Sequence, residues 1–240
     1  MSLVTEPSAT EPSATRPSVA ARASSRRLPG PLAALVGGAV ALALGRAETT
    51  PGGSPAERLD QMAGHDLRVS ATTLLVIAGF VAIVPGFWFV AATVRRRGGR
   101  GTRLGTIGSW LVLVGSTGFA VLASVDLATL AATHVSDPAA MTDFLHQLDV
   151  SPGILAVTAP ALVGYFIGPF LVTLAARRSG IGPKWLPTLV LVCLVVQPVG
   201  AALGGPPVAR VADLVLQLGL VVAVVLLARA VTAEGGGARH

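Results

Sequence analysis

Asp126 is the residue of this sequence best suited to chemistry, because it is a lone acid within a long apolar stretch. No other charged residue occurs between Leu104 and Leu130. A carboxylate at membrane depth is costly, and such groups commonly handle protons, ions or substrates. Counting a span of about 20 residues from Arg103 puts Asp126 at the outer rim of a membrane, whereas counting from Trp110 puts it about one turn inside. A functional carboxylate and an interfacial, locally hydrogen-bonded carboxylate both remain open.

Three uncharged polar side chains also interrupt apolar stretches, namely Tyr165, Gln197 and Gln217. Together with Asp126 and helices kinked by internal prolines, they could form a ligand or ion site. Hydrogen bonding between neighbouring helices is the simpler interpretation of such side chains and is favoured. A ligand or ion site requires Asp126, Gln197 and Gln217 to meet on one cavity.

A second group of titratable side chains lies between two apolar stretches. His134 and Asp137 are three residues apart, as are Asp143 and His146, which makes each pair neighbours on a helix. Imidazole and carboxylate groups can bind zinc, so these four residues are the candidates for an outward-facing metal or enzyme site. However, the set holds no cysteine and no HExxH motif. The polar face of an amphipathic helix is therefore the favoured interpretation.

The sequence lacks the motifs of several other enzyme classes. The sequence has no Walker loop, no GxSxG elbow and no Cys-x-x-Cys pair, which disfavours ATPases, serine hydrolases and thiol redox enzymes. All four histidines fall outside the apolar stretches, where haem ligands between spans would have to lie. The single cysteine, Cys193, allows no internal disulfide. We therefore predict no cofactor and favour a protein that is not an enzyme.

Composition places these residues in a membrane protein. The 240 residues are 52% hydrophobic and only 12% charged, with a mean hydropathy of +0.71, whereas a soluble domain carries about 25% charged residues. Several apolar stretches approach the roughly 20 residues that cross a bilayer. We predict an all-α, polytopic bundle of six transmembrane helices. The predicted spans are about 29–46, 69–94, 104–130, 154–176, 185–203 and 211–230.

Arginine placement predicts the orientation of these spans. The segment Arg95–Arg103 holds five arginines and three glycines between two apolar stretches, which is typical of a short cytoplasmic turn. With that turn inside, 14 basic residues are cytoplasmic and four lie outside, while eight of the acids lie outside. Both termini are then predicted to be cytoplasmic, in the plasma membrane of a bacterium.

The same distribution predicts the partners. Basic residues mark the ends of apolar stretches and do not follow one continuous face, so the net charge of +6 does not indicate nucleic acid. The expected partner is the lipid bilayer, and protein partners and self-association are left open.

Both ends of the chain are predicted to be unstructured. Residues 1–28 repeat the motif EPSAT and hold few apolar residues, which predicts a disordered cytoplasmic tail, and residues 233–240 are predicted to be flexible. The first apolar stretch, Leu32–Leu44, has only 13 residues, which suits a short span or the core of a cleaved signal peptide. We favour a retained helix, so that residues 29–232 form one six-helix domain.

Two outer connections share a design. Ser54, Pro55 and Glu57 form a capping box, and apolar residues recur at helical spacing after Asp137. Both features predict short interfacial helices on the outer surface. The two connections align at an offset of 83 residues, and Gly86 and the arginines that follow it align with Gly168 and its arginines at an offset of 82. Either a duplicated helix–outer helix–helix unit or shared topology would produce this match.

The tandem hairpins, the outer segment Asp137–Ala140 and the arginine-rich inner turns together resemble a group of small multi-pass membrane proteins of actinobacteria, which are mostly uncharacterised. The resemblance covers the organisation of about residues 30–230. It implies a helical bundle and supplies no activity or site residue.

Three hypotheses for function follow. The leading one is a non-enzymatic membrane module, either an accessory subunit or a small sensor, because intramembrane polarity is sparse and no catalytic constellation is present. The first alternative is a small transporter or channel-like protein that uses Asp126 and the proline-kinked helices. The second is a membrane enzyme with an outward-facing His/Asp site.

Overall fold

A computed structural model describes residues 28–48, 54–99, 101–134, 137–203 and 205–237. Within these ranges every regular element is an α-helix, as predicted, and no strand occurs. The predicted tail at 1–28 lies outside the described residues apart from Leu28. The helices are α1 (Gly30–Glu48), α2 (Pro55–Met62), α3 (Asp66–Arg97), α4 (Thr102–Ala132), α5 (Pro138–Asp149), α6 (Pro152–Arg178), α7 (Leu186–Leu203) and α8 (Gly205–Gly237).

Five of these helices are long and apolar enough to cross a membrane, namely α1, α3, α4, α6 and α8. The apolar part of α7, Leu186–Gly200, is shorter. Helices α3, α4 and α6 contain their predicted spans with few residues added, and α1 matches its span to within two residues at each end. Helix α8 is the exception. That helix begins at Gly205 and continues to Gly237, beyond both ends of the predicted span 211–230. Val231, which is 4% exposed, belongs to the apolar core, and flexibility of residues 233–240 stays a prediction.

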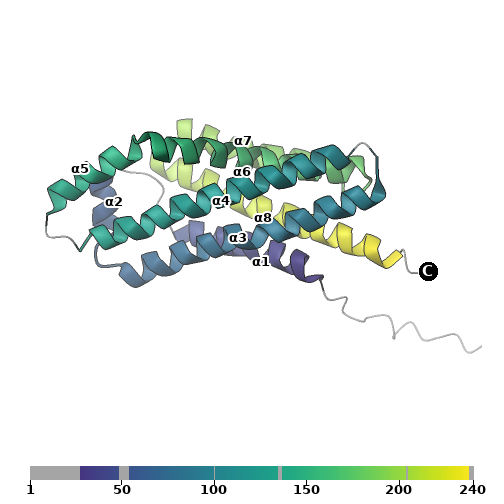
Figure 1. Ribbon diagram of the computed structural model, residues 1–240, viewed down its shortest axis with the longest axis horizontal. Coiled ribbons are helices and arrows are strands. Elements are labelled where there is room, and N and C mark those ends of the chain that lie inside the picture. The colour runs from purple at the N-terminus through teal and green to yellow at the C-terminus, as the bar shows by residue number, and fades with distance from the viewer. Residues whose placement is uncertain (1–27, 49–53, 100, 135–136, 204, 238–240) are drawn as a thin grey trace, which may run out of the picture.

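The long helices form a closed ring. Around it, α1 packs against α3, α3 against α4, α4 against α6, α6 against α7, α7 against α8, and α8 against α1. In addition, α3 and α6 meet across the ring. The helices run roughly along one axis, which gives the bundle two ends (Figure 1).

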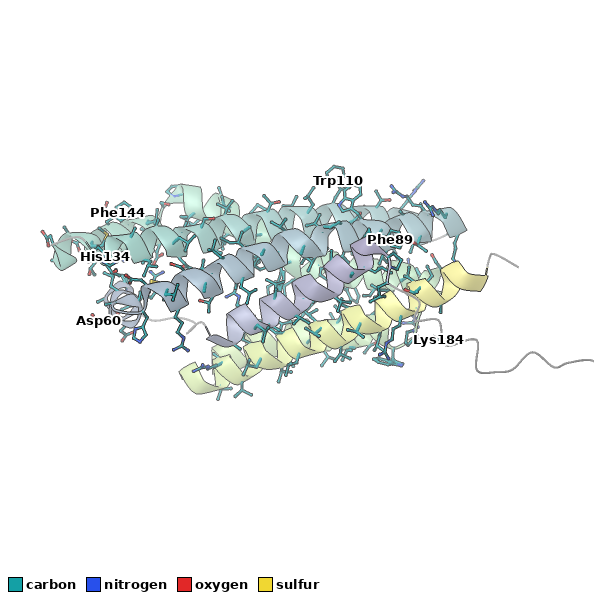
Figure 2. All side chains as sticks on the ribbon, turned by 90° about the horizontal axis from the view of Figure 1, so that it is seen from below. Asp60, Phe89, Trp110, His134, Phe144 and Lys184 are labelled. Carbon is teal, nitrogen blue, oxygen red and sulfur yellow. The ribbon has the colours of Figure 1, made fainter. Side chains whose placement is uncertain are left out.

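The two ends of the bundle differ in charge. The short helices α2 and α5 lie together at one end, far from the α3–α4 connection and the C-terminal end of α8 (Figure 1). We call the end that carries α2 and α5 the acidic end, and the end that carries the α3–α4 connection the arginine end. Figure 2 shows Asp60, His134 and Phe144 at the acidic end and Lys184 towards the other. The charged residues at the arginine end include Arg95, Arg96, Arg97, Arg103, Arg177, Arg178 and Lys184.

Glycines let the helices of two hairpins approach closely. In the α4–α6 hairpin, a Cβ atom on Gly164 would collide with the backbone of Leu111 and Gly115. In the α1–α3 hairpin, a Cβ atom on Gly38 would lie 2.9 Å from the carbonyl oxygen of Gly79. Gly164 and Gly168 are four residues apart, a small-residue spacing that here serves the packing of α6 on α4.

The two hairpins also correspond position by position. Gly38 meets Ile83 in the first hairpin, and Gly115 meets Tyr165 in the second. The first helices are thus related by 115 − 38 = 77 residues and the second by 165 − 83 = 82 residues. The contact of Leu35 with Gly86 and that of Val112 with Gly168 obey the same two offsets. This spatial match supports a duplicated unit.

Candidate functional site: a polar column inside the helix ring

Tyr165 and Gln217 meet across the interior of the ring. Tyr165 lies on α6 and is 8% exposed, and Gln217 lies on α8 and is 5% exposed. The two side chains are within hydrogen-bonding reach of each other, although their helices are not neighbours in the ring. Tyr165 is 13 residues from the start of α6, or about 20 Å along the helix, so the contact lies near the middle of the bundle.

Aromatic packing fixes the ring of Tyr165. The ring centroid of Phe119 lies 5.1 Å away and that of Phe80 lies 5.8 Å away, both in edge-on geometry. Phe80 and Phe119 are themselves stacked at 5.4 Å. Such a cluster restrains the phenol to one position, and Gly115 gives the backbone of Tyr165 room beside α4. The hydroxyl is therefore presented to Gln217 by a rigid support.

Asp213 continues the polar contacts by one turn towards the acidic end. Its carboxylate is within hydrogen-bonding reach of Gln217, and the charge of Arg46 acts on it. The guanidinium of Arg210 donates a hydrogen bond of 3.2 Å to the carbonyl of Ala47. This bond sets the beginning of α8 beside the end of α1. Arg46 and Asp213 are consequently at similar depth in the bundle, and both are half-buried.

Asp126 lies nearer the acidic end, on the side of α4 where charges from three other helices reach it. The charges that act on its carboxylate belong to Arg46 of α1, Arg58 of α2 and Asp149 of α5. Arg58 and Asp149 also form an ion pair with each other, which joins α2 to α5. Asp126 itself is exposed. Its position favours a solvated interfacial carboxylate over one isolated in the apolar core.

These side chains form what we call the polar column: Asp126, Arg46, Asp213, Gln217 and Tyr165. Exposure decreases along it, from the exposed Asp126 through the half-buried Arg46 and Asp213 to the buried Gln217 and Tyr165. The column thus runs from the acidic end to the middle of the ring.

The other half of the core is apolar. Between Tyr165 and the arginine end, the fully buried side chains include Val90, Val94, Val172, Ala175 and Ala176. The one buried hydroxyl of α6 in this half, that of Thr173, donates to carbonyls of its own helix, at Pro169 and Phe170. No charged side chain is buried in the described part of the chain. The hydroxyl of Ser109 on α4, also buried in this half, likewise donates within its own helix, to the carbonyl of Thr106. Charged and amide side chains therefore approach the centre from the acidic end only.

The structure brings together part of the site that the sequence predicts. Tyr165 and Gln217 are in contact, and Asp126 is linked to them through the charge of Arg46. Gln197 is half-buried on α7, and no side-chain hydrogen bond from it occurs among the described residues. Its predicted meeting with Asp126 and Gln217 is not observed.

Arg46 and Asp213 are the residues that sequence reasoning misses. The sequence predicts that both lie at span boundaries, where charged residues are ordinary. Because α8 begins at Gly205, Asp213 is instead eight residues inside its helix. The available signal was that the segment before Asp213 could already be helical, since prolines at 206 and 207 are acceptable in a first helical turn.

The candidate metal residues are used structurally. His134 Nε2 lies 3.0 Å from Asp66 Oδ2, which ties the end of α4 to the start of α3. Asp137 caps α5 by accepting bonds from the backbone N–H groups of Ala139 and Ala140, each at 3.1 Å. Asp143 and His146 are exposed on α5. Across the described ranges, no group of three or more His, Cys, Asp or Glu side chains is placed to hold a metal ion.

No family model matches the chain, and no curated protein or solved structure matches it either. The chemistry of the site therefore has to be argued from its own residues. The polar column offers hydrogen-bond donors and acceptors and paired charges. It could accept a proton or a small polar group from the acidic end.

Proposed function

We propose that this protein is a non-enzymatic membrane module that acts as a sensor, and that the polar column is its working part. The observation that carries the proposal is the burial of two polar side chains near the middle of the ring, Gln217 at 5% exposure and Tyr165 at 8%. Buried polar groups of this kind are expensive inside a membrane and are commonly functional. A column that begins at one face and ends halfway suits reception of a signal from that face.

The proposed placement is the plasma membrane of a bacterium, with six spans and both termini in the cytoplasm. In this placement the arginine end is cytoplasmic, and the acidic end faces outwards. Helix α7 brings the number of spans to six and is the fifth in chain order. It has 18 residues, or about 27 Å at 1.5 Å per residue, which nearly matches a hydrocarbon core of about 30 Å.

The column can convert a local event into a change of helix packing. Arg46 belongs to the first hairpin, Tyr165 to the second, and Asp213 and Gln217 to the hairpin of α7 and α8. A proton or polar ligand that competes for Gln217 would therefore alter contacts among all three hairpins. Packed interfaces switch between discrete arrangements, so such a change would also shift the helices at the arginine end.

The test removes the side-chain amide of Gln217 and measures the distance between α6 and α8 at the arginine end. Spin labels are placed at Arg178→Cys and Ala233→Cys, on α6 and α8, in a Cys193→Ala background in nanodiscs. We expect Gln217→Leu to shift the distance between the labels by about 2 Å, the scale of helix shifts at interfaces. Gln197→Leu, the matched control, should leave the distance unchanged. An unchanged distance in Gln217→Leu would refute coupling between the column and the arginine end.

A transporter is the second candidate, and the position of the column favours it. The Tyr165–Gln217 contact lies near mid-bundle between repeated hairpins, where transporters commonly bind substrates and coupling ions. The two candidates predict different proton fluxes across the membrane. For a sensor, proteoliposomes with an internal pH dye should conduct no more protons than empty liposomes. Proton flux in the wild type that is lost in Gln217→Leu and kept in Gln197→Leu would establish the transporter instead.

A further inference from the structure

Two tryptophans from neighbouring helices meet on the outside of the bundle. Trp88 of α3 and Trp110 of α4 make an edge-on contact, with their ring centroids 5.0 Å apart. Trp110 is 54% exposed and lies at the outer margin of the bundle (Figure 2). Ile107 and Val114, about one turn to either side of it along α4, are also exposed. An apolar strip with an aromatic pair therefore faces the surroundings of the α3–α4 hairpin.

Two arginines lie beyond this pair, one on each helix. Arg95 follows Trp88 by seven residues, and Arg103 precedes Trp110 by seven residues. Seven residues make about two helical turns, so each arginine lies on the same face as its tryptophan, about 10 Å nearer the arginine end. Because α3 and α4 run antiparallel, equal steps along the two helices lead from the tryptophan pair to the arginine pair. Arg95 and Arg103 therefore lie opposite each other.

The charges of these two arginines are not neutralised within the described part of the chain. Arg95 and Arg103 are exposed, and neither forms an ion pair with another described residue. Arg97 differs, because its Nη1 atom donates a hydrogen bond of 2.8 Å to the carbonyl of Ser179 beyond the end of α6. Among the acids in the described ranges, only Glu234, near the end of α8, belongs to the arginine end.

The helix dipoles account for only one of the two arginines. Arg95 lies in the last turn of α3, where the dipole favours a cation. Arg103 lies in the first turn of α4, where a positive charge is unfavourable, and that turn holds no acid. An anion between Arg95 and Arg103 would offset both the repulsion between the two guanidinium groups and the unfavourable placement of Arg103.

The depth of the four residues matches the layers of a lipid bilayer. Tryptophans concentrate where the hydrocarbon core meets the headgroups, and the headgroup layer adds roughly 5–8 Å on each side of that core. With the tryptophan pair at this boundary, the backbone of Arg95 and Arg103 lies about 10 Å further out. Long arginine side chains can bend back along the protein surface, so both guanidinium groups reach the level of the lipid phosphates.

We propose that Arg95, Arg103, Trp88 and Trp110 form a binding site for one anionic glycerophospholipid, which we call the lipid site. The lipid phosphate lies between the two guanidinium groups, whose fork of N–H donors suits phosphate oxygens. The acyl chains lie over the tryptophan pair and the apolar strip of α4. Basic sites between membrane helices are known to hold anionic headgroups in this way. The inference rests on the proposed membrane placement and goes beyond the sensor function, since it does not involve the polar column.

The experiment titrates lipid into the full chain in detergent micelles and counts bound lipids by native mass spectrometry. Phosphatidylglycerol is compared with phosphatidylcholine of the same acyl chains, and the wild type should bind phosphatidylglycerol more tightly. Arg95→Gln/Arg103→Gln should weaken phosphatidylglycerol binding about fivefold for each arginine removed and leave phosphatidylcholine binding unchanged. Arg95→Lys/Arg103→Lys keeps both charges and should keep most of the affinity, which a damaged fold would not do.

The matched control removes two arginines from the same end of the bundle. Arg177 and Arg178 are exposed in the last turn of α6, a helix that has no tryptophan, so Arg177→Gln/Arg178→Gln should leave the first bound phosphatidylglycerol in place. An equal loss of affinity in this control would refute the lipid site, because diffuse charge would then hold the lipid.

Two other results would also overturn the proposal. Equal wild-type affinities for phosphatidylglycerol and phosphatidylcholine would show that the arginine pair does not select an anionic headgroup. Displacement of phosphatidylglycerol by excess glycerol phosphate would show that the site takes a soluble phosphate instead of a lipid. None of these measurements involves Gln217, so failure of the lipid site and failure of the proposed sensor are distinguishable.

Discussion

A tyrosine and a glutamine lie close to each other near the middle of an otherwise apolar ring, where each gives the other a polar neighbour. The amide of Gln217 can donate and accept at once, and it serves both the hydroxyl of Tyr165 and the carboxylate of Asp213. A single residue is thus the polar neighbour of both the buried Tyr165 and the half-buried Asp213, and a polar group left unpaired away from water would be costly. One amide is therefore enough to give both side chains a polar neighbour at the middle of the bundle.

The first prediction concerns this pair. In a double-mutant cycle of Tyr165→Phe and Gln217→Leu, we expect a coupling free energy of about 1 kcal/mol, because hydrogen bonds between membrane helices average roughly 0.6 and reach roughly 1.7 kcal/mol. Unfolding in mixed detergent micelles gives the four stabilities. Thr173→Val is the control for Tyr165→Phe, since the Thr173 hydroxyl bonds only within its own helix. Strict additivity of the two changes would argue against the contact.

The candidate residues could be found from sequence, but their contacts could not. Tyr165 and Gln217 stand out because polar side chains are rare in apolar stretches. Which of Gln197 and Gln217 faces the ring depends on the rotation of α7 and α8, which uniformly apolar helices do not encode. The sequence places Asp213 at a span boundary, because it predicts the start of the last span six residues later than α8 begins.

At the scale of elements, close contacts between helices depend on the absence of side chains. Gly164 lies against the backbone of α4, and Gly219 lies against the sulfur of Cys193 on α7. Gly37, in contrast, has no neighbour within 4 Å of a hypothetical Cβ atom. The same residue type therefore has opposite roles within one bundle.

The second prediction compares two glycines. Gly164→Ala should destabilise the α4–α6 hairpin by about 1–3 kcal/mol, because the added methyl group meets backbone that cannot rotate away. Gly37→Ala should be neutral or stabilising, since alanine is the better helix former. Detergent unfolding midpoints measure both variants. Equal unfolding midpoints for the two variants would mean that α4 and α6 pack less closely at Gly164 than described.

The third prediction uses the contact between α7 and α8. In Gly219→Ala the new methyl group collides with the sulfur of Cys193, so we expect a loss of stability of about 1–3 kcal/mol. Cys193→Ala removes the sulfur, and the double variant should recover most of the loss. The same unfolding assay applies, and absence of rescue would place the two helices in another register.

The helices themselves were largely predictable. Apolar stretches bounded by arginines define spans, and the capping box at Ser54 predicts α2, whose two reciprocal bonds with Glu57 are present. The end of α8 was not predictable by the same rule. Its last turns carry small and polar residues typical of a tail, yet the helix continues to Gly237.

At the scale of the whole molecule, α1 completes the ring. Leu32 and Leu35 of this helix are fully buried, and α1 contacts both α3 and α8. Composition could not reveal this role, because a short apolar stretch after basic residues is equally typical of a signal peptide. Nor could it show the order of helices around the ring, which depends on contacts far apart in the chain.

The fourth prediction is that α1 is retained. Its removal would open the ring and leave the apolar faces of α3 and α8 without their partner. N-terminal sequencing of the membrane-extracted protein should therefore find a start before Leu28. A start after Ala47 would show that the helix is cleaved.

The fifth prediction concerns orientation. In intact cells, an impermeant thiol reagent should label Asp143→Cys and leave Gly98→Cys unlabelled, both in the Cys193→Ala background. Permeabilised cells, in which both sites should react, provide the control. The reverse pattern would place the arginine end outside.

The closure of the ring has a consequence for biosynthesis. Arg210 bonds to Ala47 across 163 residues of chain, and Arg46 finds the charge of Asp213 at the same place. During synthesis the first helix enters the bilayer long before the last hairpin leaves the ribosome. The contact between Arg210 and Ala47 can therefore form only after the last hairpin has been made, so that closure of the ring is a late step of folding. A chain truncated before α7 would leave the face of α1 that packs on α8 without its partner.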